Sequence, residues 1–569
     1  MSSSPYFLKR IRLIGFLIFA MAGIFILKLY MLQVVSGDSF RDRAEHQYVK
    51  PNQNIYDRGS IFLSNKDGSL FGGAILKSGF TAVINPKKIN DPEALYEKLS
   101  SVLSMPKPAF LEKAGKVGRE YEEIEKRLEP EKAEKIEEMD LPGVSLNKEK
   151  WRYYPGERIA SHVLGFVGYQ GEELRGQYGL ERYYEDVLNR NGALPYSNFF
   201  AEIFSGAGKI AEGNMEGDII TSLEPSVEKY LEDVLSLIYS GHKAEGAGGI
   251  IMNPANGEIY AAAAMPSFDP NSFKTEKSSG VFLNPLVESV YEMGSILKPL
   301  TIAAGIDSGT ITAESTYFDE GFLVLDGSKI SNFDGKGRGL VSMQEVLSQS
   351  LNTGAAYVAG KMGNEKFKEY MFRFGLGEKT GIDLPGEVAG LTKNLKNCKA
   401  IECATASYGH GIALTPIMTA RALSALANGG TLVSPRVVKK INYKVGLSKN
   451  ISYPEGERAV KKETSEEVTR MLVEVVDKAL LEGKMKMEHY SIAAKTGTAQ
   501  IPKKGGGGYY EDRYIHSFFG YFPAYNPKFL VFLYLVDPKD ADFASHTLTS
   551  PFIDITKFLI NYYQVPPDR

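Results

Sequence analysis

The sequence predicts an α+β protein with at least two folded regions behind a single N-terminal membrane anchor. Its 569 residues exceed the usual size of one domain, so each of two regions can bury a core of its own. An apolar run near the N-terminus is long enough to span a bilayer. In the C-terminal half, strand patterns at both ends enclose a long helical stretch, which indicates one sheet assembled from distant segments.

The predicted anchor is the run from Leu13 to Val35, in which Lys28 is the only charge. At about 1.5 Å per residue, a helix of this length just crosses the hydrocarbon layer. The basic residues before it favour the cytoplasmic side, so residues 1–12 form a short cytoplasmic tail and the chain beyond the anchor lies outside. A cleaved signal peptide is the alternative, but cleavage after Ala22 would fall within the apolar run.

Composition limits the possible functions. The formal net charge is -3, which offers no field for binding nucleic acid. The seven histidines show no paired helical spacing and two cysteines cannot complete a structural zinc site, so we expect no metal and no other cofactor. Cys398 and Cys403 could pair outside the cytoplasm, and the sequence leaves the free and bridged forms equally open.

The chain after the anchor divides into two regions. The first, residues 36–215, is strongly charged, and its stretch 111–139 carries Glu and Lys at helical spacing, which indicates solvated helix faces. The turn-forming residues 140–143 break that pattern. The second region, residues 216–569, opens with a predicted strand over 218–223.

Further strands are expected within the second region. A hairpin is predicted over residues 249–264, and two more strand segments over 491–500 and 517–536. Helical patterns fill much of 291–430. The glycines 505–508 predict a hairpin tip between the last strands.

The segment from Tyr291 to Pro299 carries the candidate chemistry. If Ser295 opens a helix, Lys298 lies one turn further on the same face, where its amine can take the hydroxyl proton. Pro299 fits this placement, because its missing amide is tolerated only near a helix start. Ser-x-x-Lys alone is weak evidence. It recurs at four other serines: Ser104, Ser145, Ser226 and Ser240.

The order of the motifs that follow distinguishes the copy at Ser295. Ser350-Leu351-Asn352 comes next, and Lys495-Thr496-Gly497-Thr498 comes after it. With Asp in the second motif, such a trio marks class A β-lactamases and penicillin-binding proteins. A second Lys-Thr-Gly at Lys379 lies in a loop-like context, whereas the copy at Lys495 follows small residues that suit a strand. We therefore expect Lys495 to be the catalytic copy.

Attack on an amide carbonyl needs an activated hydroxyl, an oxyanion hole and a proton for the departing amine. We expect Ser295 to be the nucleophile and Lys298 the general base. Ser350 and Lys495 would relay the proton outward, and Asn352 would hydrogen-bond the substrate amide. Without the rest of the trio, Ser350 and Asn352 would be interpreted as a helix cap or turn pair.

The third motif is expected to bind substrate. Thr496 and Thr498 offer hydroxyl groups to a terminal carboxylate. Gly497 would let an extended substrate backbone approach the strand. The backbone amides of Ser295 and Thr498 are the expected oxyanion donors.

The motifs together resemble the class B penicillin-binding proteins, which are monofunctional transpeptidases, over nearly the whole chain. Further segments resemble that family: Arg58-Gly59-Ser60-Ile61, Arg152-Tyr153-Tyr154-Pro155 with His162 and Gly165, Gly179-Leu180-Glu181, Gly409-His410-Gly411-Ile412 with Thr415-Pro416, Ala427-Asn428-Gly429-Gly430, and His516 to Ala524. His410 departs from the family, which often has Gln at this position, and this affects local hydrogen bonding rather than the reaction.

The resemblance implies a non-catalytic, dimerisation-like pedestal in residues 36–215 and a penicillin-binding transpeptidase domain in 216–569, with an antiparallel sheet between helices. It implies a serine enzyme that cross-links peptidoglycan stem peptides and that β-lactams inhibit through a covalent adduct. Stem peptides, lipid-linked glycan strands and β-lactams are the implied ligands. The membrane, other division proteins and a polytopic glycan polymerase are the implied partners, because no glycosyltransferase region fits between anchor and transpeptidase. The implied location is the cytoplasmic membrane, with the catalytic domain outside.

Two segments, 381–387 and 406–409, resemble the septal, cell-division branch most closely. The elongation branch of the same class is the alternative. A membrane-bound serine β-lactamase or a penicillin sensor would share the trio. A β-lactamase has little need of a pedestal and an anchor, and a sensor would normally carry a cytoplasmic signalling part.

Overall fold

The computed structural model describes residues 56–171, 173–190, 216–452 and 456–569, together with positions 21, 23 and 28. Most of the predicted anchor therefore lies outside the described residues. Among the residues that are described, none belongs to a helix with the length and apolar character needed to cross a membrane. The described chain mixes helices and strands, which agrees with the α+β prediction.

Strands from the first region and from two later segments form one sheet. Among the described residues it has seven strands, in the order β15-β14-β7-β1-β2-β3, and β4 also pairs with β2. The bounds are β1 (Ile61–Ser64), β2 (Leu70–Ile84), β3 (Glu122–Leu128), β4 (Val144–Tyr153), β7 (Gly217–Thr221), β14 (Val438–Tyr443) and β15 (Ser448–Asn450). β7 runs parallel to β1 and antiparallel to β14. The strand expected near residue 218 thus joins the sheet of the first region.

The remaining elements of the first region are short. Among the described residues they include α3 (Pro92–Leu99), α6 (Ser161–Leu164), β5 (Val167–Gln170), β6 (Glu173–Gly176), α7 (Gly179–Tyr183) and α8 (Glu185–Leu188).

The helical prediction over residues 111–139 is partly wrong. The strand β3 separates two helices, α4 (Lys107–Ala114) and α5 (Pro130–Glu138), so this stretch is not one continuous helical region. Ile124 and Leu128 of β3 are buried, and the strand pairs with β2. A strand with one solvated face also carries charges at short intervals, so the spacing of charges did not distinguish a helix from a strand here.

A five-stranded antiparallel sheet lies at the centre of the second region, in the order β16-β17-β18-β8-β9. Its strands are β8 (Gly246–Met252), β9 (Ile259–Met265), β16 (Ala493–Pro502), β17 (Tyr509–Phe522) and β18 (Phe529–Val536). The predicted hairpin over 249–264 is confirmed as β8 and β9. The glycines 505–508 lie between β16 and β17, as the sequence predicts. The sheet therefore joins the two distant ends of the region.

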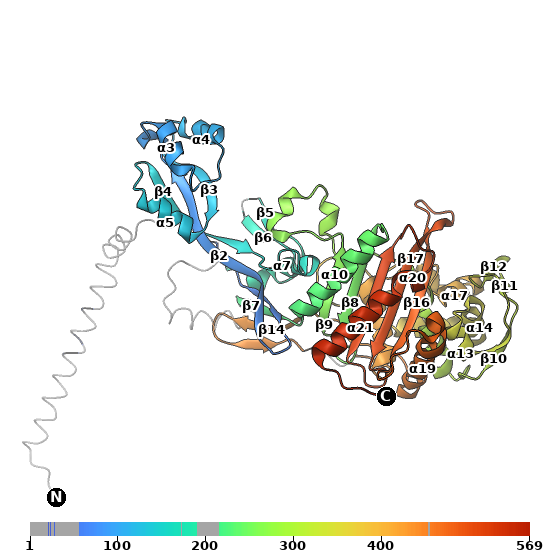
Figure 1. Ribbon diagram of the computed structural model, residues 1–569. Coiled ribbons are helices and arrows are strands. Elements are labelled where there is room, and N and C mark those ends of the chain that lie inside the picture. Colours follow the sequence, from blue (N-terminus) through green and yellow to red (C-terminus); the bar gives the residue numbers. More distant parts are fainter. Residues whose placement is uncertain are drawn as a thin grey trace, which may run out of the picture. The chain divides into compact units, whose positions relative to one another are not determined.

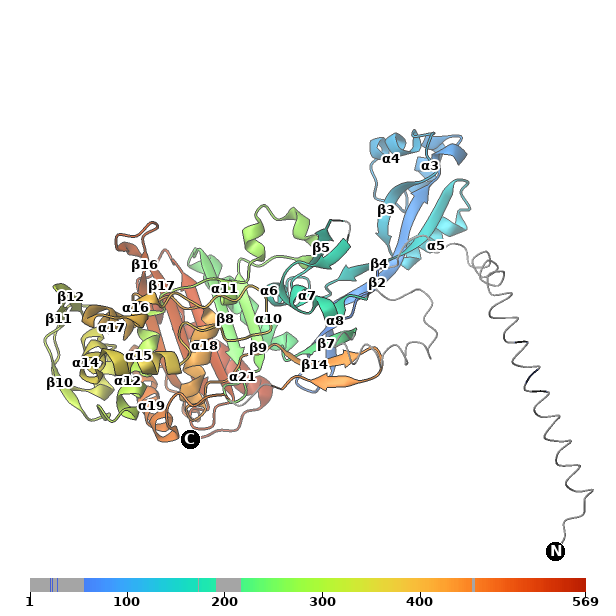
Figure 2. The ribbon, with the colours of Figure 1, turned by 180° about the vertical axis from the view of Figure 1, so that it is seen from behind.

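Helices cover both faces of this sheet. On one face lie α10 (Pro225–Gly241) and α21 (Thr549–Tyr563), as Figure 1 shows. On the other lie α12 (Lys298–Asp307) and α18 (Pro416–Ser424), with α18 visible from behind in Figure 2. Successive side chains of β17 point to opposite faces of the sheet and so contribute to both cores. Phe518 packs in the core under α10 and α21, and Phe519 packs in the core on the opposite side.

The long stretch between β9 and β16 is mainly helical, as predicted. Its further helices are α11 (Pro285–Glu288), α13 (Met343–Ser348), α14 (Asn352–Met362), α15 (Asn364–Arg373), α16 (Lys393–Lys396), α17 (Ala400–Ala406) and α19 (Lys462–Glu474). The sequence did not predict four short strands inserted there: β10 (Thr316–Asp319), β11 (Phe322–Leu325), β12 (Ser328–Ser331) and β13 (Gly339–Ser342). Cys398 and Cys403 are joined by a disulfide at the start of α17.

Two glutamates one turn apart on α10 are buried side by side. Glu228 Oε2 accepts the Ala262 N–H at 2.8 Å, and Glu232 Oε1 accepts the Ala160 N–H at 2.8 Å. The pair thereby ties α10 both to β9 and to the first region. Burial raises the pKa of both carboxyl groups, and the charge of Glu228 raises that of Glu232 further.

The free energy of unfolding should therefore fall as the pH rises. A carboxyl group with a raised folded-state pKa gives its full stabilisation below the ordinary glutamate pKa of about 4.3, and that contribution is lost as the pH rises through the raised value. Glu228→Gln keeps an acceptor for Ala262 but cannot ionise, so it should flatten the decline between about pH 5 and 8. Urea unfolding at several pH values measures the slope. An unchanged slope in this variant, or an equal change in the exposed control Glu134→Gln, would contradict the assignment.

Candidate active site

One cleft, of about 1030 Å³, brings the three sequence motifs together. Six of the eight predicted site residues line it: Ser295, Ser350, Asn352, Lys495, Thr496 and Thr498. The other two, Lys298 and Gly497, are buried behind this lining. Strand β16 provides one side of the cleft, and the helical layer provides Ser295, Ser350 and Asn352.

Ser295 lies in a 3-10 turn over Gly294–Leu297, directly before α12. The predicted helix start is thus confirmed, and Pro299 occupies the first turn of α12. Gly294 has a φ of 62°, and a Cβ on it would lie 2.7 Å from the carbonyl oxygen of Thr498. Only glycine allows the serine turn to approach β16 this closely.

The amine of Lys298 is held between two serines. Its Nζ lies 2.9 Å from Ser295 Oγ, 3.1 Å from Ser350 Oγ and 2.5 Å from the Ser350 carbonyl oxygen. Burial, together with the charge of Lys495, holds the pKa of Lys298 well below the ordinary lysine value. A neutral amine has two N–H donors and one lone pair, so Ser350 can take both donors while the lone pair faces the Ser295 hydroxyl. This is the arrangement that a general base requires.

Ser350 connects the two lysines of the site. Its Oγ lies 3.0 Å from Lys495 Nζ as well as 3.1 Å from Lys298 Nζ. Its backbone has a φ of 55°, a conformation that non-glycine residues adopt rarely and mostly at functional sites. Burial lowers the pKa of Lys495 to about 8. A hydrogen-bonded path therefore runs from Ser295 through Lys298 and Ser350 to Lys495.

Asn352 begins α14 and is fixed by the short strands that the sequence did not predict. Its Nδ2 donates to the carbonyl oxygen of Ser331, at the end of β12, at 2.9 Å. The next residue, Thr353, is fully buried and bonds through Oγ1 to Asp319 at 2.8 Å and to Asn332 at 2.9 Å. These contacts set the start of α14 relative to the cleft.

Strand β16 carries the third motif in the predicted extended form. Thr496 and Thr498 both face the cleft, and Thr498 Oγ1 accepts the Ala544 N–H at 3.1 Å. The structure indicates a reason for glycine at position 497 that differs from the predicted approach of a substrate backbone. A Cβ there would lie 2.7 Å from the Met293 carbonyl oxygen and would also meet Ser517 Oγ. Glycine therefore makes room for the serine turn itself. The other Lys-Thr-Gly, at Lys379, lies in a loop and is not part of this cleft.

Four further residues form a cluster beside the serine turn. His410 lines the cleft between the rings of Tyr408 and Tyr509, with ring centroids 5.3 and 5.7 Å away. The Tyr509 hydroxyl donates to the Glu292 carboxylate at 3.1 Å. Burial, and then the nearby Lys298, lowers the pKa of His410 to about 4, so the ring is neutral at neutral pH. The sequence marked His410 only as a departure from a family pattern.

Two aromatic side chains at the cleft were also missed. Phe333 and Phe543 are 62% and 43% exposed, and their ring centroids lie 6.0 Å apart in an edge-to-face arrangement. They come from segments more than two hundred residues apart, so no local pattern could pair them. Among the described residues, no cluster of three or more His, Cys, Asp or Glu side chains could hold a metal ion.

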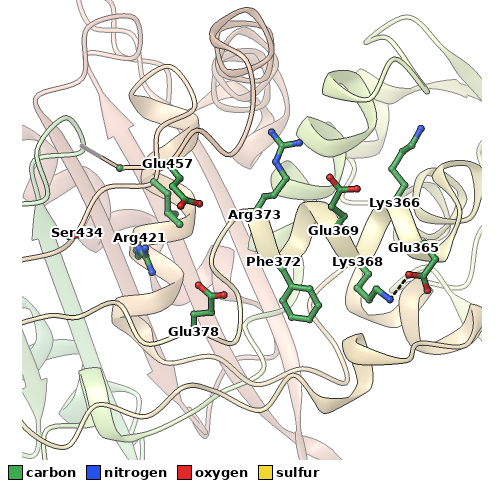
Figure 3. Close-up of a pocket in the computed structure, with 12 residues that line it drawn as sticks. Glu365, Lys366, Lys368, Glu369, Phe372, Arg373, Glu378, Arg421, Ser434 and Glu457 are labelled. Carbon is green, nitrogen blue, oxygen red and sulfur yellow. Dashed lines mark ion pairs between the residues drawn. The ribbon is translucent and has the colours of Figure 1, made fainter. Parts of the chain in front are cut away.

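A second cavity, of about 1080 Å³, contains none of the predicted site residues. Figure 3 shows side chains from α15, such as Phe372 and Arg373, on one side and Arg421 of α18 on the other. Four acidic and four basic side chains line it, and Lys368 pairs with Glu365 at 2.5 Å. With balanced charge and no nucleophile–base pair, it is not the candidate active site.

Family models match both regions of the chain. A model described as "Penicillin binding protein transpeptidase domain" matches residues 247–556, which include all eight predicted site residues. A second model, described as "Penicillin-binding Protein dimerisation domain", matches residues 58–192.

Similar sequences and structures extend over most of the chain. Stage V sporulation protein D of Bacillus subtilis is 30% identical over 96% of this chain and 84% of that protein. Peptidoglycan D,D-transpeptidase FtsI of Escherichia coli is 26% identical over 94% of this chain and 89% of that protein. Penicillin Binding Protein 2X from Streptococcus thermophilus has the same fold, with a TM-score of 0.74 at 19% identity over 89% of this chain and 79% of that one. Penicillin binding protein 3 of Mycobacterium tuberculosis, complexed with aztreonam, gives 0.68 at 21% identity over 91% and 98%.

Proposed function

The chain belongs to the penicillin-binding protein transpeptidase family, and on this premise we propose that it is a peptidoglycan D,D-transpeptidase of cell division with Ser295 as its nucleophile. The observation that carries the proposal is the partly buried path from Ser295 Oγ through Lys298 Nζ and Ser350 Oγ to Lys495 Nζ, with steps of 2.9, 3.1 and 3.0 Å. Such a path moves a proton between a nucleophile and a leaving group without a metal or cofactor.

In the first half-reaction, Lys298 takes the proton of Ser295 as Oγ forms a bond to the carbonyl carbon of the penultimate D-Ala. The backbone N–H groups of Ser295 and Thr498 stabilise the developing oxyanion. The bond to the terminal D-Ala then breaks, and its nitrogen receives a proton from the Ser350 hydroxyl. Lys298 passes the proton that it took from Ser295 on to Ser350, and Lys495 holds Ser350 Oγ by a hydrogen bond and favours this relay. Asn352 holds the substrate amide, and Thr496 and Thr498 hold the terminal carboxylate.

In the second half-reaction, the amine of another stem peptide attacks the ester on Ser295. The amine loses a proton to Lys298, the new amide bond forms, and Ser295 leaves with a proton restored to Oγ. Because the lowered pKa of Lys298 favours the neutral amine between turnovers, the same group can act as base in both halves. A β-lactam presents a strained amide beside a carboxylate and enters by the same route.

The role in division is supported by the septal-type segments 381–387 and 406–409 and by relatives that include the D,D-transpeptidase FtsI of Escherichia coli. The relative named for stage V sporulation gives a specific alternative role in spore formation. Depletion in the native cell separates the roles. Filaments are expected for a division enzyme, spheres would indicate elongation, and normal growth with defective spores would indicate sporulation.

A labelling assay tests the chemistry. The purified full chain should bind a fluorescent penicillin covalently, and it should join a stem-peptide donor to an amine acceptor in a reaction that the same penicillin blocks. Rapid hydrolysis of penicillin with many turnovers would instead favour a β-lactamase. Labelling without cross-linking of any acceptor would favour a sensor or a scaffold.

The proposal places residues 13–35 in the membrane, residues 36–215 as the pedestal and residues 216–569 outside the membrane as the catalytic domain. Lys28 is costly to expose to lipid, so it reaches the outer interface or faces a partner helix, for which a polytopic glycan polymerase is the best candidate. Exchanging 13–35 for an unrelated anchor should impair complementation and leave penicillin labelling intact. Full complementation by the exchanged chain would refute a role beyond tethering.

A further inference from the structure

The segment 542–547 closes one side of the cleft and contacts the third motif. Asp542, Phe543 and Ala544 line the cleft, and α20 (Ala544–Thr547) packs against β16 and β17. The Ala544 N–H donates to Thr498 Oγ1 at 3.1 Å. A hydroxyl oxygen that accepts a hydrogen bond from one side keeps its own proton for an acceptor on another. The contact therefore leaves the Thr498 O–H available to a ligand in the cleft.

A buried histidine holds the far end of the same segment. His516 lies on β17 directly opposite Thr498 in the strand register and is fully buried. Its Nδ1 lies 2.9 Å from Oγ1 of Thr547, which is 2% exposed. Thr547 Oγ1 in turn lies 3.4 Å from the Ala544 carbonyl oxygen. These contacts connect four residues in a closed circuit. Thr498 lies opposite His516 in the strand pair, and His516 contacts Thr547. Thr547 contacts Ala544, whose N–H donates back to Thr498.

His516 cannot itself bind a substrate anion. Burial lowers the pKa of its ring to about 4, so the ring is neutral at neutral pH. It also has no surface open to the cleft, since its exposed fraction is 0%. His516 can therefore affect a ligand only through neighbouring residues, and Thr547 and Ala544 connect its side chain to Thr498.

We propose that His516 and Thr547 are positioning residues that hold the Ala544 N–H on Thr498 Oγ1, so that the Thr498 hydroxyl donates to the terminal carboxylate of the substrate or of a β-lactam. The inference rests on the proposed function, because it assigns the carboxylate to Thr498. It adds that His516 and Thr547, whose side chains touch no ligand, determine the direction in which the Thr498 hydroxyl donates its hydrogen bond. Loss of the circuit should then weaken recognition of the carboxylate specifically, not the chemistry at Ser295.

The test compares one penicillin as the free acid and as its methyl ester. Thr547→Val removes the hydroxyl at nearly constant volume and should lower the second-order acylation rate constant for the free acid by about tenfold, since a hydrogen bond to a charged group is lost. The rate constant for the ester should stay within about twofold, because the ester offers no charged acceptor. Thr547→Ser should restore the free-acid rate. Equal slowing of both ligands would overturn the proposal, because it is the result expected of a purely structural role.

Two further comparisons distinguish a positioning role of Thr547 from a general disturbance of the structure by the substitution. Thr556 on α21 is also fully buried and donates its hydroxyl to the Phe552 carbonyl oxygen at 2.8 Å. Thr556→Val therefore makes the same chemical change away from the cleft, and its ratio of free-acid to ester rates should equal that of the wild type. In a Thr498→Val background, Thr547→Val should cause no further loss, because both changes remove one interaction. Independent losses that multiply would overturn the proposal.

If Thr547→Val does not fold, His516 provides a second route. His516→Asn can place an amide N–H near the position of Nδ1 and should keep the wild-type ratio, whereas His516→Leu should reduce it as Thr547→Val does. The same ratio in both His516 variants would contradict the inference. Failure of the proposed function looks different, since the wild-type chain would then form no adduct with the free acid.

Discussion

Replacing Lys298 with alanine should slow the acylation of Ser295 by penicillin by about 10²–10⁴-fold, the range typical of a lost general base. The amine lies 2.9 Å from Ser295 Oγ, and burial lowers its pKa, which favours the neutral amine with its lone pair. The other amine of the site, Lys495, is one serine further along the path, so it cannot take the Ser295 proton directly. Stopped-flow competition with a fluorescent penicillin measures the second-order rate constant.

Lys379→Ala is the matched control for this change. Lys379 belongs to the other Lys-Thr-Gly and lies in a loop outside the cleft, so its loss should leave acylation within about twofold of wild type, as for most surface substitutions. Melting temperatures verify that both variants are folded. Acylation of Lys298→Ala at the wild-type rate would mean that another group activates Ser295, and the assignment of the base would be wrong.

The largest loss of stability is expected from Glu181→Ala in the first region. Glu181 is fully buried, and its carboxylate accepts from Arg58 Nε at 2.6 Å and from Arg152 Nε at 2.5 Å. Although burial opposes it, the charges of Arg152 and Arg58 hold the pKa of Glu181 below the ordinary value. Removing the carboxylate leaves two buried guanidinium groups without their shared counter-charge. We expect a loss of about 3–5 kcal/mol in the free energy of unfolding.

Glu185→Ala is the control for that change, because Glu185 also pairs with Arg58, at 2.7 Å, but is 20% exposed. Its loss should cost about 1 kcal/mol, since water can replace part of the interaction. Urea unfolding of both variants gives the two values. Equal losses would show that the buried position of Glu181 adds nothing to the pair.

The sequence predicted the centre of the site well because the chemistry there is local or ordered along the chain. Ser295 and Lys298 are three residues apart and meet within one helical turn. The small residues before Lys495 indicated a strand, and β16 is that strand. The central sheet was also predictable, since β8 and β18 are apolar strands bounded by turns, and their positions at opposite ends of the region required a sheet built from distant segments.

The parts that were missed depend on contacts between distant segments. Strands β10 to β13 are only four residues each, too short for a periodic signal within a helical stretch, yet β12 supplies the carbonyl that fixes Asn352. The reason for Gly497 lies in the Met293 carbonyl, two hundred residues earlier. β3 was predicted as helix because charge spacing describes only its solvated face, while its pairing with β2 decides the structure.

Peptide-level mass spectrometry after incubation with penicillin tests the central claim most directly. The leaving group of a β-lactam stays attached to the acyl chain and blocks the approach of an acceptor amine, so the acyl-enzyme should persist. We predict a single long-lived adduct on the peptide that contains Ser295, absent in Ser295→Ala. An adduct on one of the other Ser-x-x-Lys serines instead, or rapid loss of the Ser295 adduct with continued hydrolysis of penicillin, would contradict the assignment of this chain as a transpeptidase acting through Ser295.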